Sequence, residues 1–179
     1  MAGSDAQMSP TQSAKVQMRS TMRAWRRSLD DADLTRRSAR LVANVAPLLA
    51  PRGLIIGYDA IRGEPDLASL WENYTAAGAT VRRVTSADDP CTLPLDDVAA
   101  VVMPALAVTP TGQRLGQGGG WFDRLLARCD ATVTTIAVCF DEQVVDALAV
   151  DDHDRLVDLV VTDQRAIVAS AGGTGRQPT

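Results

Sequence analysis

Lysine is almost missing from this chain of 179 residues, because Lys15 is the only one among 18 basic residues. The basic residues are outnumbered by 22 acidic ones, and the net charge is −4. This balance excludes a broad nucleic-acid-binding surface, so any anionic ligand has to be met by a local group of basic side chains. We therefore expect small-molecule ligands and no nucleic-acid partner.

Cysteine and long apolar runs are also scarce. Cys91, Cys129 and Cys139 are widely separated and show no CxxC spacing, which excludes a disulfide framework and a zinc site. No apolar run approaches the roughly 20 residues of a membrane span, and the first residues lack the hydrophobic stretch of a signal peptide. We expect a cytoplasmic protein with no membrane partner.

What the chain does contain is enough apolar material for one core. Hydrophobic residues make up 46% of it, which favours a single domain at this length. Both ends are instead rich in Gly, Ser, Thr and Pro, a composition that offers little apolar surface to bury. We expect flexible tails at residues 1–12 and 169–179 around one domain at residues 13–168.

The pattern within the domain alternates between two periodicities. Apolar residues recur at helical spacing in two N-terminal segments, 14–29 and 31–49. The apolar runs that predict strands are 54–58, 79–84, 98–106, 134–140 and 155–162, and the helical patterns between them are 65–78, 120–129 and 141–149. This alternation predicts an α/β fold: one three-layer domain with a mostly parallel sheet, helices on both faces and two N-terminal helices.

The segment GQRLGQGGGWFDR, residues 112–124, follows the third of these runs. Glycines let backbone N–H groups approach an anion, and Arg114 and Arg124 stand beside them. The segment is not a Walker A loop, since no lysine follows it, and it comes too late in the chain for a dinucleotide fingerprint. From spacing alone, a phosphate loop and an ordinary flexible turn both remain open.

A longer stretch carries a resemblance to a known family. PALAVTPTGQRLGQGGGWFDRLL is similar to the signature P-G-L-A-F-D-x-x-G-x-R-L-G-x-G-x-G-Y-Y-D-x-x-L of the 5-formyltetrahydrofolate cyclo-ligase family. The residues in register are Pro104, Leu106, Ala107, Gly112, Arg114, Leu115, Gly116, Gly118, Gly120, Asp123 and Leu126. Lys15 and Arg19 match the family's K-x-x-x-R, and GYDAIRGEP resembles its tyrosine, short loop and glutamate.

The resemblance implies a ligase that uses ATP and Mg²⁺ to phosphorylate the N5-formyl oxygen of a reduced folate, after which N10 attacks and phosphate leaves. It implies catalytic roles for Arg114 and Asp123, and a metal site at Asp123 and Asp154. It places the organic substrate at Tyr58, Glu64 and Trp121. The ATP contacts that it implies are Lys15, Arg19, Arg114, Leu115, Gly116, Gln117, Gly118, Gly119, Gly120, Trp121 and Phe122.

The chain departs from the family pattern on the substrate side. Residues 85–97 stand where relatives usually carry a longer segment that helps to line the pterin site, and AVTP at 107–110 replaces A-F-D. Trp121 and Phe122 replace a pair of tyrosines, which keeps the aromatic rings and removes two hydroxyls. These changes leave open whether the substrate is a folate.

Three functional hypotheses follow: a cyclo-ligase acting on 5-formyltetrahydrofolate, a paralogue that activates another amide or carboxylate with ATP, and a non-catalytic nucleotide-binding relative. Joint retention of Lys15, Arg19, Arg114 and Asp123 argues against the third. Structural alternatives exist for single residues: Lys15 and Arg19 also fit one solvated helix face, and Asp154 also fits a solvated acidic loop.

Overall fold

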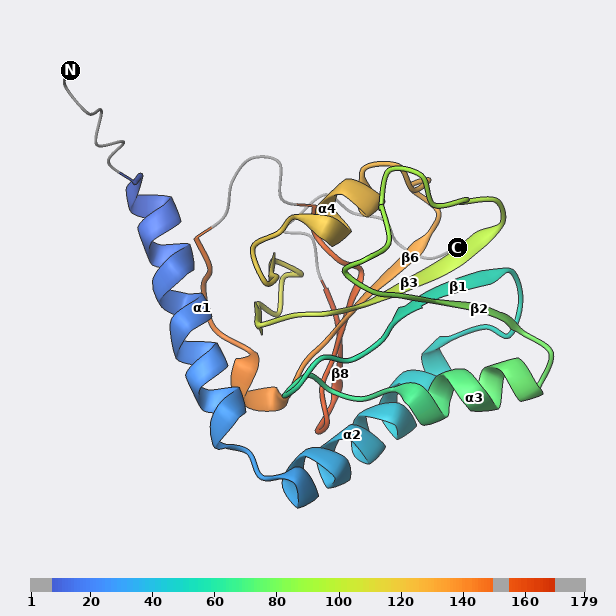
Figure 1. The fold of residues 1–179 in the computed structure, drawn as a ribbon, viewed down its shortest axis with the longest axis horizontal. Coiled ribbons are helices and arrows are strands. Elements are labelled where there is room, and N and C mark those ends of the chain that lie inside the picture. The colour runs from blue at the N-terminus through green and yellow to red at the C-terminus, as the bar shows by residue number, and fades with distance from the viewer. Residues whose placement is uncertain (1–7, 150–154, 170–179) are drawn as a thin grey trace.

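A computed structural model describes residues 8–149 and 155–169. Its main sheet has the strand order β2-β1-β3-β6-β7-β8, in which all neighbours are parallel except β7 and β8 (Figure 1). The strands are β1 (Leu54–Tyr58), β2 (Thr80–Val84), β3 (Val98–Pro104), β6 (Thr134–Val138), β7 (Leu159–Val161) and β8 (Ala166–Val168). A second, two-stranded sheet joins β4 (Ala107–Val108) to β5 (Arg114–Leu115).

Helices cover both faces of the main sheet. They are α1 (Pro10–Ser28), α2 (Asp31–Val45), α3 (Ala68–Ala76) and α4 (Trp121–Leu126), with short 3₁₀ turns η1 (Ala46–Leu48) and η2 (Asp141–Gln143). Figure 1 shows α2 and α3 on one side of the sheet, α4 on the other, and α1 at one end. The predicted α/β fold with a mostly parallel sheet is confirmed. No helix within residues 8–149 and 155–169 is long and apolar enough to cross a membrane.

The core lies where the central strands are buried on both faces. The middle residues of β3 and nearly all of β6 are buried, as expected for apolar runs in a parallel sheet. α3 packs closely on β1 because Gly57 has no side chain: a Cβ there would lie 2.7 Å from the Trp71 ring. The Trp71 indole N–H also donates to the Tyr58 carbonyl, which fixes α3 near the end of β1.

Several local features differ from the prediction. The helical pattern at 141–149 is wrong beyond η2, because Val144 and Val145 pair with Val108 of β4 instead of continuing a helix. The β4–β5 hairpin was not predicted within the glycine-rich segment. Three predicted strands were also too long, since β3, β6 and β7 occupy only parts of the apolar runs.

The first helix begins earlier than the pattern at 14–29 predicts. Ser9 caps it by accepting from the Gln12 N–H, and Pro10 occupies the first turn, where its missing N–H costs nothing. The helix therefore gains a turn at its N-terminal end.

The strand order determines where a ligand crevice forms. β2 lies on one side of β1 and β3 on the other, so the chain changes direction across the sheet at this pair. Loops that leave two such strands diverge and open a crevice at the carboxyl ends. Here these loops are residues 59–67 after β1 and the glycine-rich segment after β3.

Candidate active site

A cavity of about 760 Å³ lies at this end of the sheet. α1, the loop after β1, the end of β2 and the glycine-rich segment all contribute to its walls. The predicted site residues that line it are Lys15, Arg19, Tyr58, Glu64, Arg114, Leu115, Gly116, Gln117, Gly118, Gly119, Gly120, Trp121, Phe122 and Asp123. Asp154, the second predicted metal ligand, lies outside the described residues. The structure thus gathers four segments that are separate in the chain around one space.

The glycine loop, residues 116–120, packs directly against α1. Gly118 has φ +104°, which only glycine adopts readily, and a Cβ there would lie 3.3 Å from Nε of Arg19. That Nε also donates to the Gly116 carbonyl at 3.0 Å. Glycine at 118 is therefore favoured by the backbone angle, and it leaves room for the close approach of an arginine.

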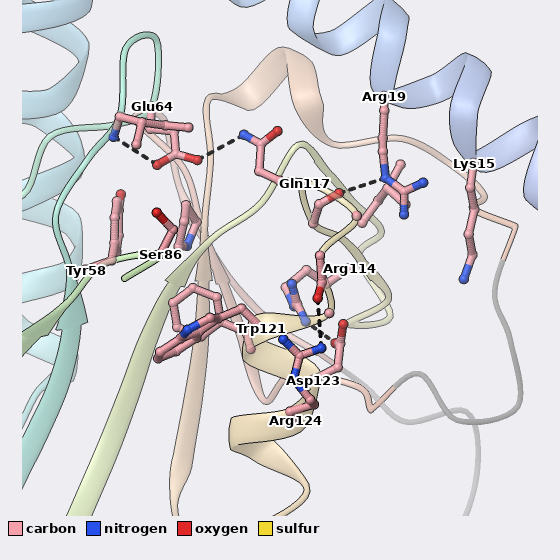
Figure 2. Close-up of a pocket in the computed structure, with 18 of the residues that line it drawn as sticks. Lys15, Arg19, Tyr58, Glu64, Ser86, Arg114, Gln117, Trp121, Asp123 and Arg124 are labelled. Atoms are coloured by element: carbon pink, nitrogen blue, oxygen red, sulfur yellow. Dashed lines mark hydrogen bonds and ion pairs between the residues drawn. The ribbon is translucent and has the colours of Figure 1, made fainter. Parts of the chain in front are cut away.

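Basic side chains meet at the cavity from several elements. Lys15 and Arg19 lie one turn apart on α1, and Arg114 comes from β5. Lys15 is only 9% exposed, which contradicts a fully solvated helix face. Figure 2 shows Lys15 and Arg19 on the α1 side of the cavity, with Arg114 below the glycine loop. Partial enclosure strengthens the attraction of these charges for an anion.

Arg114 and Asp123 form an ion pair within the cavity wall. The Arg114 side chain is 4% exposed, whereas that of Asp123, in the first turn of α4, is 45% exposed. Within the described part of the chain no three Asp, Glu, His or Cys residues are grouped to hold a metal. A single accessible carboxylate suits Mg²⁺, which commonly takes one or two protein ligands and completes its shell with water and phosphate oxygens.

Tyr58 contributes its ring to the cavity and uses its hydroxyl elsewhere. The phenol is buried and donates to the Pro65 carbonyl at 2.5 Å. Burial, reinforced by the nearby charge of Glu64, raises the pKa of Tyr58 well above its ordinary value. The side chain is therefore a neutral wall of the cavity and a brace for the loop after β1.

Glu64 is a buried carboxylate that three groups hold in place. Its Oε2 accepts the Ile61 N–H at 3.2 Å, and its Oε1 accepts Nε2 of Gln117 at 3.1 Å. Nη1 of Arg26 lies 3.7 Å from Oε1, and both side chains of this ion pair are 5% exposed or less. The carboxylate is therefore fixed in position while it lines the cavity.

Arg26 anchors α1 beneath the cavity, a role that sequence reasoning missed. It donates to the Ala105 carbonyl, just after β3, and to Oε1 of Gln143. Burial lowers the pKa of Arg26, and the charge of Glu64 opposes that shift. Its position seven residues after Arg19, two turns along the same helix face, was the available signal.

Trp121 ties the segment 85–97 to α4. Its indole N–H donates to the Asp88 carbonyl at 2.7 Å, and its ring meets Phe122 edge-on with centroids 4.8 Å apart. Arg128 holds the same segment through the Pro90 and Leu93 carbonyls. The indole N–H is thus used inside the protein, and the Trp121 ring lines the cavity beside this segment.

Several lining residues were not predicted. Gln12 and Val16 belong to the same helical stripe as Lys15 and Arg19, so the spacing could have revealed them. Ser86 follows the carboxyl end of β2, which borders the crevice. Arg124, noted only as a neighbour of the glycines, lines the cavity and donates to the Gly119 carbonyl at 2.8 Å.

Comparison with known proteins identifies the family. A family model described as the 5-formyltetrahydrofolate cyclo-ligase family matches residues 70–163, which include the glycine loop and Asp123. The chain belongs to the 5-formyltetrahydrofolate cyclo-ligase family. A 5-formyltetrahydrofolate cyclo-ligase of Mycolicibacterium smegmatis is 26% identical, over 90% of this chain and 99% of the relative. One from Mus musculus is 37% identical over 34% of this chain and 32% of its own length.

Solved structures support the cyclo-ligase fold. A 5,10-methenyltetrahydrofolate synthetase from Mycoplasma pneumoniae superposes with a TM-score of 0.73 at 19% identity, covering 83% of this chain and 98% of the other. The Aquifex aeolicus 5,10-methenyltetrahydrofolate synthetase also gives 0.73, at 22% identity, covering 91% and 96%. At these identities the likeness concerns the fold, which both proteins share with this family member along most of their length.

Proposed function

We propose that this protein converts 5-formyltetrahydrofolate to 5,10-methenyltetrahydrofolate with ATP and Mg²⁺. The observation that carries the proposal is the division of one cavity into two sides. Lys15, Arg19 and the glycine loop lie on one side, and Tyr58, Glu64 and Trp121 on the other (Figure 2). Family membership and the named relative from Mycolicibacterium smegmatis support the same reaction.

The reaction needs a phosphoryl acceptor and donor held in line. The formyl oxygen attacks the γ-phosphorus of ATP and ADP leaves; N10 then attacks the formyl carbon, loses its proton, and the phosphorylated oxygen departs as phosphate. Alignment of the two reactants lowers the barrier of such a step. Lys15, Arg19 and Arg114 are suited to neutralise charge that spreads over the transferring phosphoryl oxygens.

The glycine loop and Asp123 serve the phosphate side. Backbone N–H groups of residues 116–120 can approach phosphate oxygens closely because four of these five residues are glycine. Asp123 is the residue that fits Mg²⁺, and the bound ion supplies further charge neutralisation at the phosphates. Arg114, paired with Asp123, holds that carboxylate at the edge of the cavity.

The other side suits a planar ring with N–H donors. The rings of Tyr58 and Trp121 offer apolar surface, and Glu64 offers a carboxylate that is buried and therefore ready to accept hydrogen bonds without losing much solvation. A pterin presents both features. Since the Tyr58 hydroxyl and the Trp121 N–H are used internally, recognition by these two residues is by ring contact.

A different amide substrate is the second candidate. It is favoured by the segment 85–97, which Trp121 and Arg128 hold against α4 at the substrate side of the cavity. A segment fixed in this way limits the shape of the organic substrate that fits beside it. The ATP side of the proposal is the same for both candidates.

The deciding experiment follows methenyltetrahydrofolate absorbance and ADP release with purified protein, Mg²⁺, ATP and 5-formyltetrahydrofolate. We expect both signals to require ATP, and Arg114→Ala to lower kcat/KM by about 10²–10³, the usual effect of removing one transition-state donor. Gln113→Ala, in the same segment but outside the cavity lining, is the control. ADP release with another amide and none with the folate would favour the second candidate. No turnover with either would refute the proposal.

A further inference from the structure

Gln117 connects the two sides of the cavity. It stands between Gly116 and Gly118 in the glycine loop, and its side-chain amide is used at both ends. Its Oε1 accepts a hydrogen bond from Nε of Arg23 at 3.0 Å. Its Nε2 donates to Oε1 of Glu64 at 3.1 Å, the bond marked in Figure 2. The Gln117 carbonyl also accepts Nη2 of Arg23 at 2.7 Å. The residue thus links α1, the glycine loop and the loop after β1.

The bond to Glu64 is the important one. The other contacts of this carboxylate, from Arg26 and the Ile61 N–H, come from α1 and from its own loop. Within the described residues, Gln117 is the hydrogen-bond link between Glu64 and the glycine loop. A displacement of the loop therefore moves or releases one of the groups that hold the carboxylate.

Burial in the core does not account for the placement of the Gln117 side chain. The residue is exposed, in contrast to the buried Arg26 on the opposite side of the same carboxylate. Surface substitutions without burial usually change stability by no more than about 0.5 kcal/mol. Its amide is nevertheless held at two points and lines the cavity, which is the placement expected of a group that positions others.

We propose that Gln117 is a positioning residue that couples the nucleotide loop to the carboxylate facing the organic substrate, so that each ligand strengthens binding of the other. This rests on the proposed function, in which the glycine loop holds ATP and Glu64 faces the organic substrate. A nucleotide that fixes the loop also fixes the Gln117 amide and restricts Glu64. The second ligand then meets a site that is already ordered, and by linkage the effect is reciprocal.

The test measures the dissociation constant of Mg²⁺ and a non-hydrolysable ATP analogue, with and without 5-formyltetrahydrofolate, by titration calorimetry. We expect the folate to tighten nucleotide binding about 5-fold or more in the wild type, the lower end of typical coupling. Gln117→Met keeps the length of the side chain and removes its amide. The ratio of the nucleotide dissociation constants without and with the folate should therefore fall to about 1. Gln113→Met, the same change outside the cavity lining, should keep the wild-type ratio.

A second measurement does not depend on the folate. Hydrogen exchange of residues 59–66 should slow when the ATP analogue binds the wild type, and this protection should be lost in Gln117→Met. Equal ratios and equal protection in the two proteins would overturn the coupling, as would independent binding in the wild type. Formation of methenyltetrahydrofolate is measured separately. Cooperative binding without this product supports the coupling and counts against the proposed function. Product formation with independent binding supports the proposed function and counts against the coupling.

Discussion

At the scale of single residues, the cavity balances its carboxylates with arginines. Each of the three acidic side chains that line the cavity forms an ion pair with an arginine. The pairs are Asp59 with Arg83, Glu64 with Arg26, and Asp123 with Arg114. Lys15, Arg19 and Arg124 add further positive charge to the lining. A chain of net charge −4 thus presents a locally basic cavity, which is the charge that a polyphosphate requires.

Trp121 provides a test of the organic side. Trp121→Ala removes the ring and should raise KM for the organic substrate roughly 2–10-fold, the usual worth of one aromatic contact, with a smaller change in KM for ATP. Trp121→Phe keeps a ring and loses the bond to the Asp88 carbonyl, so its effect should be intermediate. Steady-state kinetics with each substrate varied in turn provide the measurement. Equal changes in both KM values would remove Trp121 from the organic side.

At the scale of elements, arginines determine how the helices sit on the sheet. Arg19, Arg23 and Arg26 follow one another at helical spacing on α1, and each donates to a backbone carbonyl next to the cavity. The helix is therefore held by its polar face as well as by its apolar one. Any movement of α1 therefore also moves Lys15 and Arg19, two of the cations that line the cavity.

Arg37 on α2 also ties its helix to distant parts of the chain, and its removal should destabilise the protein. It binds both Glu142 carboxylate oxygens, at 2.7 and 2.8 Å, and lies 3.3 Å from the buried Asp163. We expect Arg37→Ala to lower the free energy of unfolding by about 1–3 kcal/mol, since it leaves charged groups with fewer partners. Arg36→Ala, at a more exposed neighbouring position, should cost under about 1 kcal/mol. Urea unfolding measures both.

The pH dependence of the stability lost in Arg37→Ala shows which interaction of Arg37 is responsible. Hydrogen bonding from Arg37 lowers the pKa of Glu142 below its ordinary value of 4.5. A carboxyl with a lowered folded pKa stabilises the protein above its unfolded pKa and ceases to do so as the pH falls through the folded one. The difference between wild type and Arg37→Ala should therefore be full at pH 7 and shrink below pH 4.5. A constant difference would assign the loss to the stacking of Arg37 on Trp25 and Phe140 instead.

At the scale of the whole molecule, the cavity exists only when the sheet is formed. Its cations extend from Lys15 on the first helix to Arg124 on α4, and the switch between β1 and β3 brings them to one end of the sheet. A ligand that binds this assembly does not bind the unfolded chain. Occupancy of the cavity should therefore be visible as global stabilisation.

We expect Mg²⁺ with a non-hydrolysable ATP analogue, at about 100 times its Kd, to stabilise the fold by about 2.7 kcal/mol. For a chain of this size that corresponds to a rise in Tm of roughly 5–10 °C. Lys15→Ala should reduce the rise at the same nucleotide concentration, and Lys15→Arg, which keeps the charge, should retain part of it. Thermal unfolding followed by circular dichroism gives the comparison. An undiminished shift in Lys15→Ala would remove Lys15 from the nucleotide side.

Local pattern determined the fold class and the family of this protein. Apolar runs bounded by helical patterns suffice to predict a parallel α/β sheet, because periodicity and burial act over a few residues. The order of glycine, arginine and aspartate at 112–124 carries the resemblance to the family, because such a signature lies in consecutive residues and is visible without the fold. Lys15 and Arg19 were found through the family's K-x-x-x-R, which also spans only a few consecutive residues.

The tertiary structure alone decided which groups meet. Val144 and Val145 pair with β4 instead of continuing a helix. The helical pattern did not predict this pairing, because β4 is far away in the sequence. Trp121 reaches a carbonyl 33 residues away, and Gln117 reaches a carboxylate 53 residues away. No local signal encodes such bonds, because they depend on how the sheet places its loops. The sequence by itself therefore identifies the family, and only the folded sheet connects the glycine loop to Glu64.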